Sequence, residues 1–144
     1  KNMLTRLQKF LPENAKQPGD QIWFVLDVDR WKRESIDELR DLCSTYDGWE
    51  VAISNPCFEV WLYFHFDDPR KANANSAKDF KRLLGSLHTS GYAVEHFAPK
   101  ISEAARNARQ DDPTPTHDYP DQWATTKVYR LAEEMLKFLG KNWF

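Results

Sequence analysis

An almost unbroken apolar segment, Ile22-Trp23-Phe24-Val25-Leu26-Asp27-Val28, is the feature that most constrains how this chain folds. Its length suits a β-strand, and consecutive apolar residues are typical of a strand covered on both faces, as in a parallel sheet. A helical pattern follows over residues 30–46, and Glu50-Val51-Ala52-Ile53 is a second short strand. This strand, helix and strand, joined by short turns, predict a right-handed parallel crossover unit and therefore an α/β fold.

Five further helices are predicted around this unit. They cover residues 3–11, Cys57 to Phe66, a Ser76 cap to near Gly91, Pro99 to Gln110, and a Thr125 or Thr126 cap to Gly140. The segment 110–122 holds three prolines and four aspartates, which is typical of a long exposed or functional loop. The 144 residues suit one domain, 1–144.

The charge balance excludes one broad class of function. With 20 Lys and Arg against 22 Asp and Glu, the net charge is -2, so no global positive field draws the chain to nucleic acid or anionic lipid. Contact with nucleic acid then requires a local basic patch or a bound cation. No apolar run approaches the roughly 20 residues that span a bilayer, and no signal peptide is present, so we expect a soluble, cytoplasmic protein.

The cysteines and histidines do not form a metal-binding pattern. Cys43 and Cys57 are too few for a disulfide framework or a zinc site, and we expect buried free thiols. The spacing of the four histidines matches no zinc motif, and each is interpreted as an ordinary core-edge or surface residue: His65, His88, His96 and His117.

Asp27-Val28-Asp29 closes the apolar strand and is the sharpest chemical feature. Alternate side chains of an extended strand project from one face, roughly 6.5 to 7 Å apart. Ligands of parallel sheets bind beyond the carboxyl ends of the strands, and hard oxygen ligands suit Mg²⁺ or Mn²⁺. Asp27 and Asp29 are therefore candidate metal ligands and catalytic residues. The alternative is that they only begin the turn and cap the next helix.

Glu59 and Asn55 extend this candidate site. Glu59 is the one carboxylate in an otherwise apolar segment, and a buried carboxylate requires a partner or a metal. It follows the second strand, so it is predicted to open onto the same edge as Asp27 and Asp29. An equally good interpretation pairs Glu59 with Arg30, Arg33 or another base. Asn55, at the turn, is a candidate for binding a phosphate or orienting a carboxylate.

A basic helix face could supply substrate contacts. Lys100, Arg106 and Arg109 lie on one side of the helix predicted over 99–110 and are candidate substrate-binding residues. Four further basic residues could join that patch: Lys71, Lys78, Lys81 and Arg82. An ordinary solvated helix face is the alternative. The aromatic residues of 57–66 likewise suit core packing better than a platform for nucleic-acid bases.

The strand-end Asp27-x-Asp29, followed by Ser54-Asn55-Pro56-Cys57-Phe58-Glu59-Val60-Trp61-Leu62, resembles the RloB-like proteins, a Toprim-related group of prokaryotic defence loci. The stretch 119–131 is similar to the family's closing Asn-Pro-x-Thr-x-Val-x-x-Leu segment, more loosely. The resemblance covers about residues 22–139. It implies a Toprim-like parallel-sheet core with flanking helices, and an acidic cluster that binds Mg²⁺ or Mn²⁺ for phosphodiester hydrolysis in antiphage defence.

One departure from the family leaves a second function open. Toprim-like members carry a further Glu at the end of an earlier strand, and no such strand precedes Lys1, so we expect either an amino-terminally incomplete domain or a degenerate member. The first hypothesis is a metal-dependent nuclease that acts on DNA or RNA. The second is a non-catalytic module that docks a partner ATPase encoded nearby, which the resemblance also implies.

Overall fold

A computed structural model describes residues 3–10, 17–87 and 93–140 of the chain. Along the chain it contains α1 (Met3–Phe10), β1 (Ile22–Asp27), α2 (Arg33–Ser44), β2 (Trp49–Asn55), α3 (Glu59–Tyr63), η1 (Pro69–Lys71), α4 (Ala77–Leu87), α5 (Val94–Phe97), η2 (Ala98–Lys100), α6 (Ile101–Gln110), β3 (Thr125–Thr126) and α7 (Val128–Leu139). Three positions used in the sequence predictions, Leu11, His88 and Gly91, lie outside the described residues. None of the helices described here is long and apolar enough to cross a membrane.

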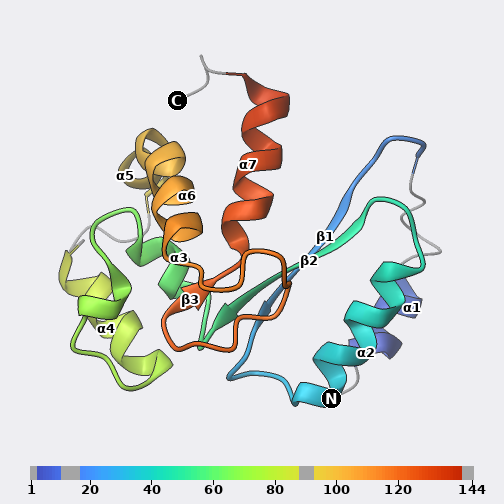
Figure 1. Ribbon diagram of the computed structural model, residues 1–144, viewed down its shortest axis with the longest axis horizontal. Coiled ribbons are helices and arrows are strands. Elements are labelled where there is room, and N and C mark those ends of the chain that lie inside the picture. Colours follow the sequence, from blue (N-terminus) through green and yellow to red (C-terminus); the bar gives the residue numbers. More distant parts are fainter. Residues whose placement is uncertain (1–2, 11–16, 88–92, 141–144) are drawn as a thin grey trace.

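The sheet is mixed and has the order β1-β2-β3 among the described strands. β1 and β2 are parallel, in a register that runs from Ile22 opposite Trp49 to Asp27 opposite Ser54. This confirms the predicted unit of strand, helix and strand. β3 is antiparallel to β2, so a short antiparallel strand is added to the predicted parallel pair. The fold is α/β, with helices on both faces of an open three-stranded sheet (Figure 1).

β3 replaces the helix cap predicted at Thr125 or Thr126. The hydroxyls of Thr126 and Ser54 are hydrogen-bonded across the two strands at 2.7 Å, and both are buried. The Lys127 amide extends the pairing by donating to the Ile53 carbonyl at 2.8 Å. The Thr126 hydroxyl also accepts a hydrogen bond from the Val128 amide at 3.1 Å. Thr126 therefore serves both the strand pairing and the start of α7.

Alternation along the strands divides the core into two clusters. On one face, β1 and β2 pack against α1 and α2 through side chains that include Leu26, Ile36, Leu39, Val51 and Ile53. On the other face, Ala52 contacts a cluster formed with α3, α4, α6 and α7, which includes Trp61, Phe80, Ala108, Val128 and Tyr129. Figure 1 shows these two groups of helices on opposite sides of the sheet.

Two predictions about burial need correction. The face of β1 toward α7 is only partly covered, since 44% of Val25 is exposed, so β1 is not a strand buried on both faces. The helix predicted over Cys57–Phe66 contains only Glu59–Tyr63 as α-helix, with turns after it. Four of its large side chains are partly exposed, those of Phe58, Leu62, Tyr63 and Phe66, although the short helix contacts α4, β2 and β3.

A buried ion pair anchors the loop that precedes β3. The Lys127 ammonium and the Asp112 carboxylate are 2.5 Å apart, and their side chains are 0% and 1% exposed. Lys127 also donates to the carbonyl oxygen of Thr114 at 2.6 Å, and the Tyr129 hydroxyl donates to Asp112 at 2.5 Å. These contacts lower the pKa of Asp112, although its burial opposes the shift. The predicted loop 110–122 is therefore tied internally to the base of α7.

Candidate functional site

The carboxyl ends of β1 and β2 meet at one edge of the sheet, and the predicted acidic residues lie there. Beyond the last paired residues, the Val28 amide donates to the Ser54 carbonyl at 3.0 Å. The Asp29 amide then donates to the Pro56 carbonyl at 3.1 Å. These bonds hold the segment after β1 against the connection from β2 to α3. We call Asp27, Asp29 and Glu59 the carboxylate edge.

The backbone at this edge differs from the extended geometry expected for Asp27 and Asp29. β1 ends at Asp27, and the Arg30 amide donates to the Asp27 carbonyl at 3.1 Å, which closes a turn. The two side chains are therefore not related by one pleat of a strand. Asp27 is half-buried, whereas Asp29 is exposed at the start of the turn. One carboxylate oxygen of Asp27 accepts a hydrogen bond from the Phe58 amide at 2.8 Å.

Asp27 is influenced by both other carboxylates of this edge. The pKa of Asp27 is raised above its ordinary value, first by burial and then by the negative charges of Asp29 and Glu59. The Phe58 amide and the positive charge of Lys81 oppose this rise. Negative charges that repel one another in this way are stabilised by a cation placed among them.

Glu59 is paired with a base, as one of the two sequence interpretations expected, and that base is Lys81, not Arg30 or Arg33. Its carboxylate lies 3.8 Å from the ammonium of Lys81 on α4, and 17% of its side chain is exposed. Arg33 contacts Asp37 at 3.1 Å and Asp121 at 3.4 Å instead. Lys81 therefore lies beside the carboxylate edge, a position that its grouping with other basic residues in the sequence does not suggest.

Both cysteines are buried free thiols, which confirms that prediction. Cys57 lies next to the carboxylate edge. Burial, together with a hydrogen bond to Glu59, raises the pKa of its thiol to about 12. The thiolate is the nucleophilic form of cysteine, so this thiol is inert near neutral pH.

The carboxylate edge fits only one of the usual ways of binding a divalent ion. In the part of the chain that the structure describes, no three His, Cys, Asp or Glu residues are grouped so that they could hold a metal. Mg²⁺, however, is commonly bound through one or two carboxylates and retains several waters. Exposed Asp29 and the carboxylate oxygen of Asp27 that does not accept from Phe58 suit that mode.

Asn55 holds the loop before β3. Its side-chain amide donates to the carbonyl oxygens of Pro120 at 2.9 Å and Asp121 at 3.4 Å. In this arrangement its donors face the protein backbone, not the space above the carboxylate edge. The sequence interpretation of Asn55 as a substrate-binding residue stays a prediction.

We expect Asn55→Asp to lower the free energy of unfolding by about 1–3 kcal/mol, because a carboxylate cannot donate to the two backbone carbonyls. Urea unfolding followed by circular dichroism measures the change. Asn73→Asp, at an exposed position, is the matched control and should stay within about 0.5 kcal/mol of the wild type. Equal stability of Asn55→Asp and the wild type would contradict the anchoring role.

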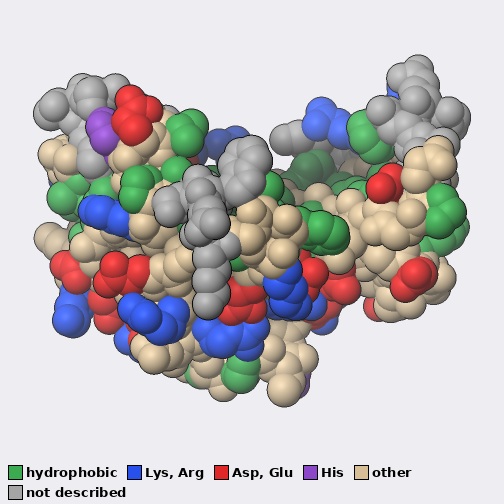
Figure 2. Space-filling view, turned by 90° about the horizontal axis from the view of Figure 1, so that it is seen from above, with side chains coloured by type: hydrophobic (Ala, Val, Ile, Leu, Met, Phe, Trp, Pro, Cys, Tyr) green, Lys and Arg blue, Asp and Glu red, His purple; other side chains and the backbone are tan. Residues whose placement is uncertain are grey.

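The basic residues predicted on the helix over 99–110 lie away from the carboxylate edge. α3 lies between α6 and α4 in Figure 1. Arg109 is bound by Glu133 through two hydrogen bonds of 2.7 and 2.6 Å, and the ammonium of Lys100 lies 4.8 Å from the Phe66 ring centre. Arg106 is exposed and has no ion pair among the described residues. On the face shown in Figure 2, basic and acidic side chains alternate, so no single-sign surface forms there.

Comparison with known proteins assigns the family. Neither the search of curated proteins nor the search of solved structures gave a match. The family model described as RloB-like protein matches residues 1–135. That match includes the carboxylate edge and all three strands. The chain therefore belongs to the RloB-like protein family.

Proposed function

We propose that this RloB-like protein has a Toprim-like core and is a Mg²⁺-dependent nuclease that hydrolyses phosphodiester bonds in prokaryotic antiphage defence. The observation that carries the proposal is the gathering of Asp27, Asp29 and Glu59 at the carboxyl edge of the sheet, where burial and the charges of Asp29 and Glu59 raise the pKa of Asp27. Among the described residues these three carboxylates have one ion pair, that of Glu59 with Lys81, and like charges gathered in this way are frequent at functional sites. Binding a divalent cation, Mg²⁺ or Mn²⁺, is the use that fits these ligands best.

Each residue at the carboxylate edge has a distinct part in such a reaction. Asp27 and Asp29 would hold the ion, which supplies charge neutralisation at the scissile phosphate and a more acidic bound water. Glu59, which is paired with Lys81, would orient that water or accept its proton. Lys81 is 40% exposed while paired with Glu59, so its ammonium is accessible to a phosphate oxygen of the substrate.

A second candidate function needs no complete set of metal ligands. No group of three metal-binding side chains occurs among residues 3–10, 17–87 and 93–140. A non-catalytic module that docks a partner ATPase through the 110–122 loop would need no such set. The internal anchoring of that loop by Lys127 and Asn55 gives it a fixed shape, which suits a docking surface.

Incubation with plasmid DNA and with transfer RNA in Mg²⁺ tests the nuclease proposal directly. We expect cleavage of at least one substrate, complete loss of cleavage in excess EDTA, and recovery when Mg²⁺ or Mn²⁺ is returned. Cleavage that persists in EDTA would contradict the metal-dependent reaction. An inactive protein that captures its operon's ATPase in a pull-down would favour the docking module.

A further inference from the structure

An exposed tryptophan lies at the same edge of the sheet as the carboxylates. β3 is antiparallel to β2 and pairs Thr125 with Asn55, the last residue of β2. Trp123 precedes Thr125 and therefore lies beyond the carboxyl end of β2, the end at which the carboxylate edge is found. Figure 1 shows the segment that enters β3, in orange, beside the ends of β1 and β2.

Trp123 combines an exposed surface with a contact to the core. The exposed fraction of this residue is 44%, the largest among the tryptophans that the structure describes. Its ring centre lies 6.0 Å from that of Phe80, which is fully buried in α4. Part of the indole is thus held against the core, and the rest is accessible from the solvent.

The backbone around Trp123 is held in place on both sides. The next residue, Ala124, is 0% exposed and lies in the left-handed region, with a φ of 58°. The Thr125 hydroxyl donates to the Gln122 carbonyl at 2.5 Å, and Asn55 anchors the backbone just before this turn. A ring presented by a fixed backbone loses little conformational freedom when a flat ligand stacks on it.

Two lysines of α4 lie near this tryptophan. Lys81 directly follows Phe80 along the chain, and its ammonium lies 3.8 Å from the Glu59 carboxylate. Lys78 is one turn earlier on the same side of α4, is exposed, and has no ion pair among the described residues. A phosphate backbone that runs along α4 would meet both ammonium groups close to the carboxylate edge.

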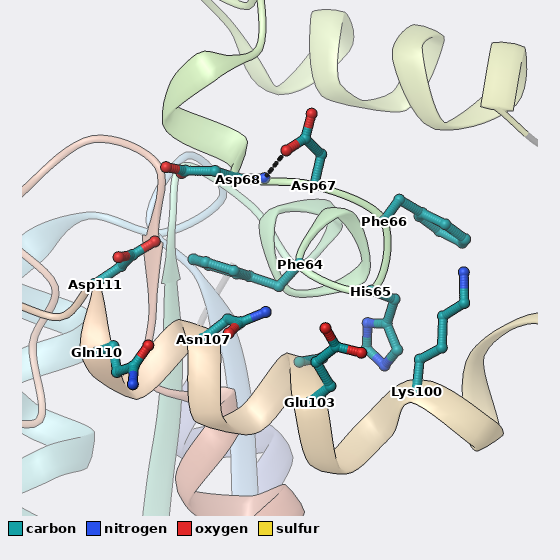
Figure 3. Close-up of a pocket in the computed structure, with 11 residues that line it drawn as sticks. Phe64, His65, Phe66, Asp67, Asp68, Lys100, Glu103, Asn107, Gln110 and Asp111 are labelled. Atoms are coloured by element: carbon teal, nitrogen blue, oxygen red, sulfur yellow. Dashed lines mark hydrogen bonds between the residues drawn. The ribbon is translucent and has the colours of Figure 1, made fainter.

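The other side of α3, toward α6, does not suit a polyanion. A pocket of about 440 Å³ lies there, between α6 and the segment that follows α3 (Figure 3). Lys100 is its one basic lining residue, against four acidic ones: Asp67, Asp68, Glu103 and Asp111. Even with Arg70, which contacts Asp68 and Asp111, the carboxylates outnumber the bases. Repulsion disfavours phosphates on this side and leaves the α4 side as the path for a nucleic acid.

The charge balance of the chain favours an unpaired strand over a duplex. Duplex binding depends mainly on contacts between basic residues and phosphates, and this chain has a net charge of -2. The paired bases inside a duplex also have no free face. An unpaired nucleotide exposes the face of its base, and stacking on an aromatic ring adds affinity for any base.

We propose that Trp123 is a stacking platform for one base of an unpaired stretch of DNA or RNA, whose phosphates contact Lys81 and Lys78. The stacked base would hold the strand next to the carboxylate edge. This inference rests on the proposed nuclease function and specifies the substrate as single-stranded.

Fluorescence anisotropy with fluorescein-labelled oligoadenylates, one of DNA and one of RNA, tests the platform. All proteins carry Asp27→Asn, so that cleavage does not consume the probe during the titration. Trp123→Leu should bind at least one single strand about fivefold or more weakly than this parent, because leucine keeps an apolar contact with Phe80 but has no flat ring. Trp123→Phe retains a ring and should bind within about twofold of the parent.

Two controls separate stacking from general effects. Phe138→Ala removes another exposed ring, that of a residue 75% exposed on α7, and should bind as the parent does. A duplex of adenine and thymine strands should bind the parent and Trp123→Leu equally, since its bases are paired. A thermal melt verifies that each variant is folded, and Trp123→Met replaces the leucine variant if that one unfolds.

Three results would overturn the proposal. One is the absence of saturable binding of either single strand to the parent. Another is equal affinity of the parent and Trp123→Leu for both single strands. The third is a loss of affinity in Trp123→Leu that the duplex or Phe138→Ala shows to the same extent. These results do not depend on cleavage, so a wild type that binds through Trp123 without cutting would contradict only the nuclease proposal.

Discussion

Replacing Asp112 by alanine is expected to lower the free energy of unfolding by about 3–5 kcal/mol, the largest stability effect in this fold. The substitution leaves the Lys127 ammonium at 0% exposure without its counter-charge. It also removes the acceptor of the Tyr129 hydroxyl, which is buried as well.

Urea unfolding measures this effect, with Asp41→Ala at an exposed position of α2 as control. The double variant Asp112→Leu and Lys127→Met should recover most of the loss, because two apolar side chains leave no buried charge. A loss of less than about 1 kcal/mol in Asp112→Ala would show that the ion pair is solvated in solution.

The same pair predicts a pH dependence. The pKa of Asp112 in the folded chain is lowered below its ordinary value of 3.8. The stabilisation from its ionised form is therefore present above that value and is lost as the pH falls further, through the folded-state pKa. The wild type should approach the stability of Asp112→Ala in this acidic range, whereas the difference between them should be constant from pH 6 to 8.

The largest effect on activity is expected for Asp27→Asn. Asparagine keeps the side-chain oxygen that accepts from the Phe58 amide, but it removes the negative charge. Loss of a metal ligand should reduce Mg²⁺-dependent cleavage by about 100-fold or more. Asp41→Asn is the matched control for cleavage and should act like the wild type.

Asp27→Asn should reduce cleavage without lowering the stability of the folded chain. Because burial and the charges of Asp29 and Glu59 raise the folded-state pKa of Asp27, its ionisation at neutral pH is less favourable in the folded chain than in the unfolded one. Removing that charge should leave the melting temperature in EDTA unchanged or higher. A variant that loses activity because it unfolds would contradict a functional role for this carboxylate.

The central unit of the fold could be predicted because its signals are local. The apolar strand, the helical pattern over 30–46 and the second strand correspond to β1, α2 and β2 in the structure. Ser76, predicted as the cap of a helix, lies at the start of α4, where its hydroxyl accepts a hydrogen bond from the Asp79 amide at 3.2 Å. Asp27 and Asp29 of the carboxylate edge are likewise predictable from the end of the first strand, and Glu59 from its place in an apolar segment.

The remaining features depend on contacts between distant parts of the chain. β3 has only two residues, and it pairs with Ser54 and Asn55, which lie about 70 positions earlier. Lys127 lies at the beginning of a predicted helix. Nothing in the local sequence indicates that its charge is buried against Asp112. Lys81 is a partial exception. It flanks the apolar stripe of α4, at Phe80 and Leu84, which places it beside the helix that α4 packs on.

The most direct test of the central claim is calorimetric titration of Mg²⁺, and then Mn²⁺, into the wild type, Asp27→Asn and Asp41→Asn. If the carboxylate edge is a metal site, the wild type and Asp41→Asn bind the ion with equal affinity, and binding is lost in Asp27→Asn. No binding to the wild type, or equal binding to all three proteins, would contradict the account.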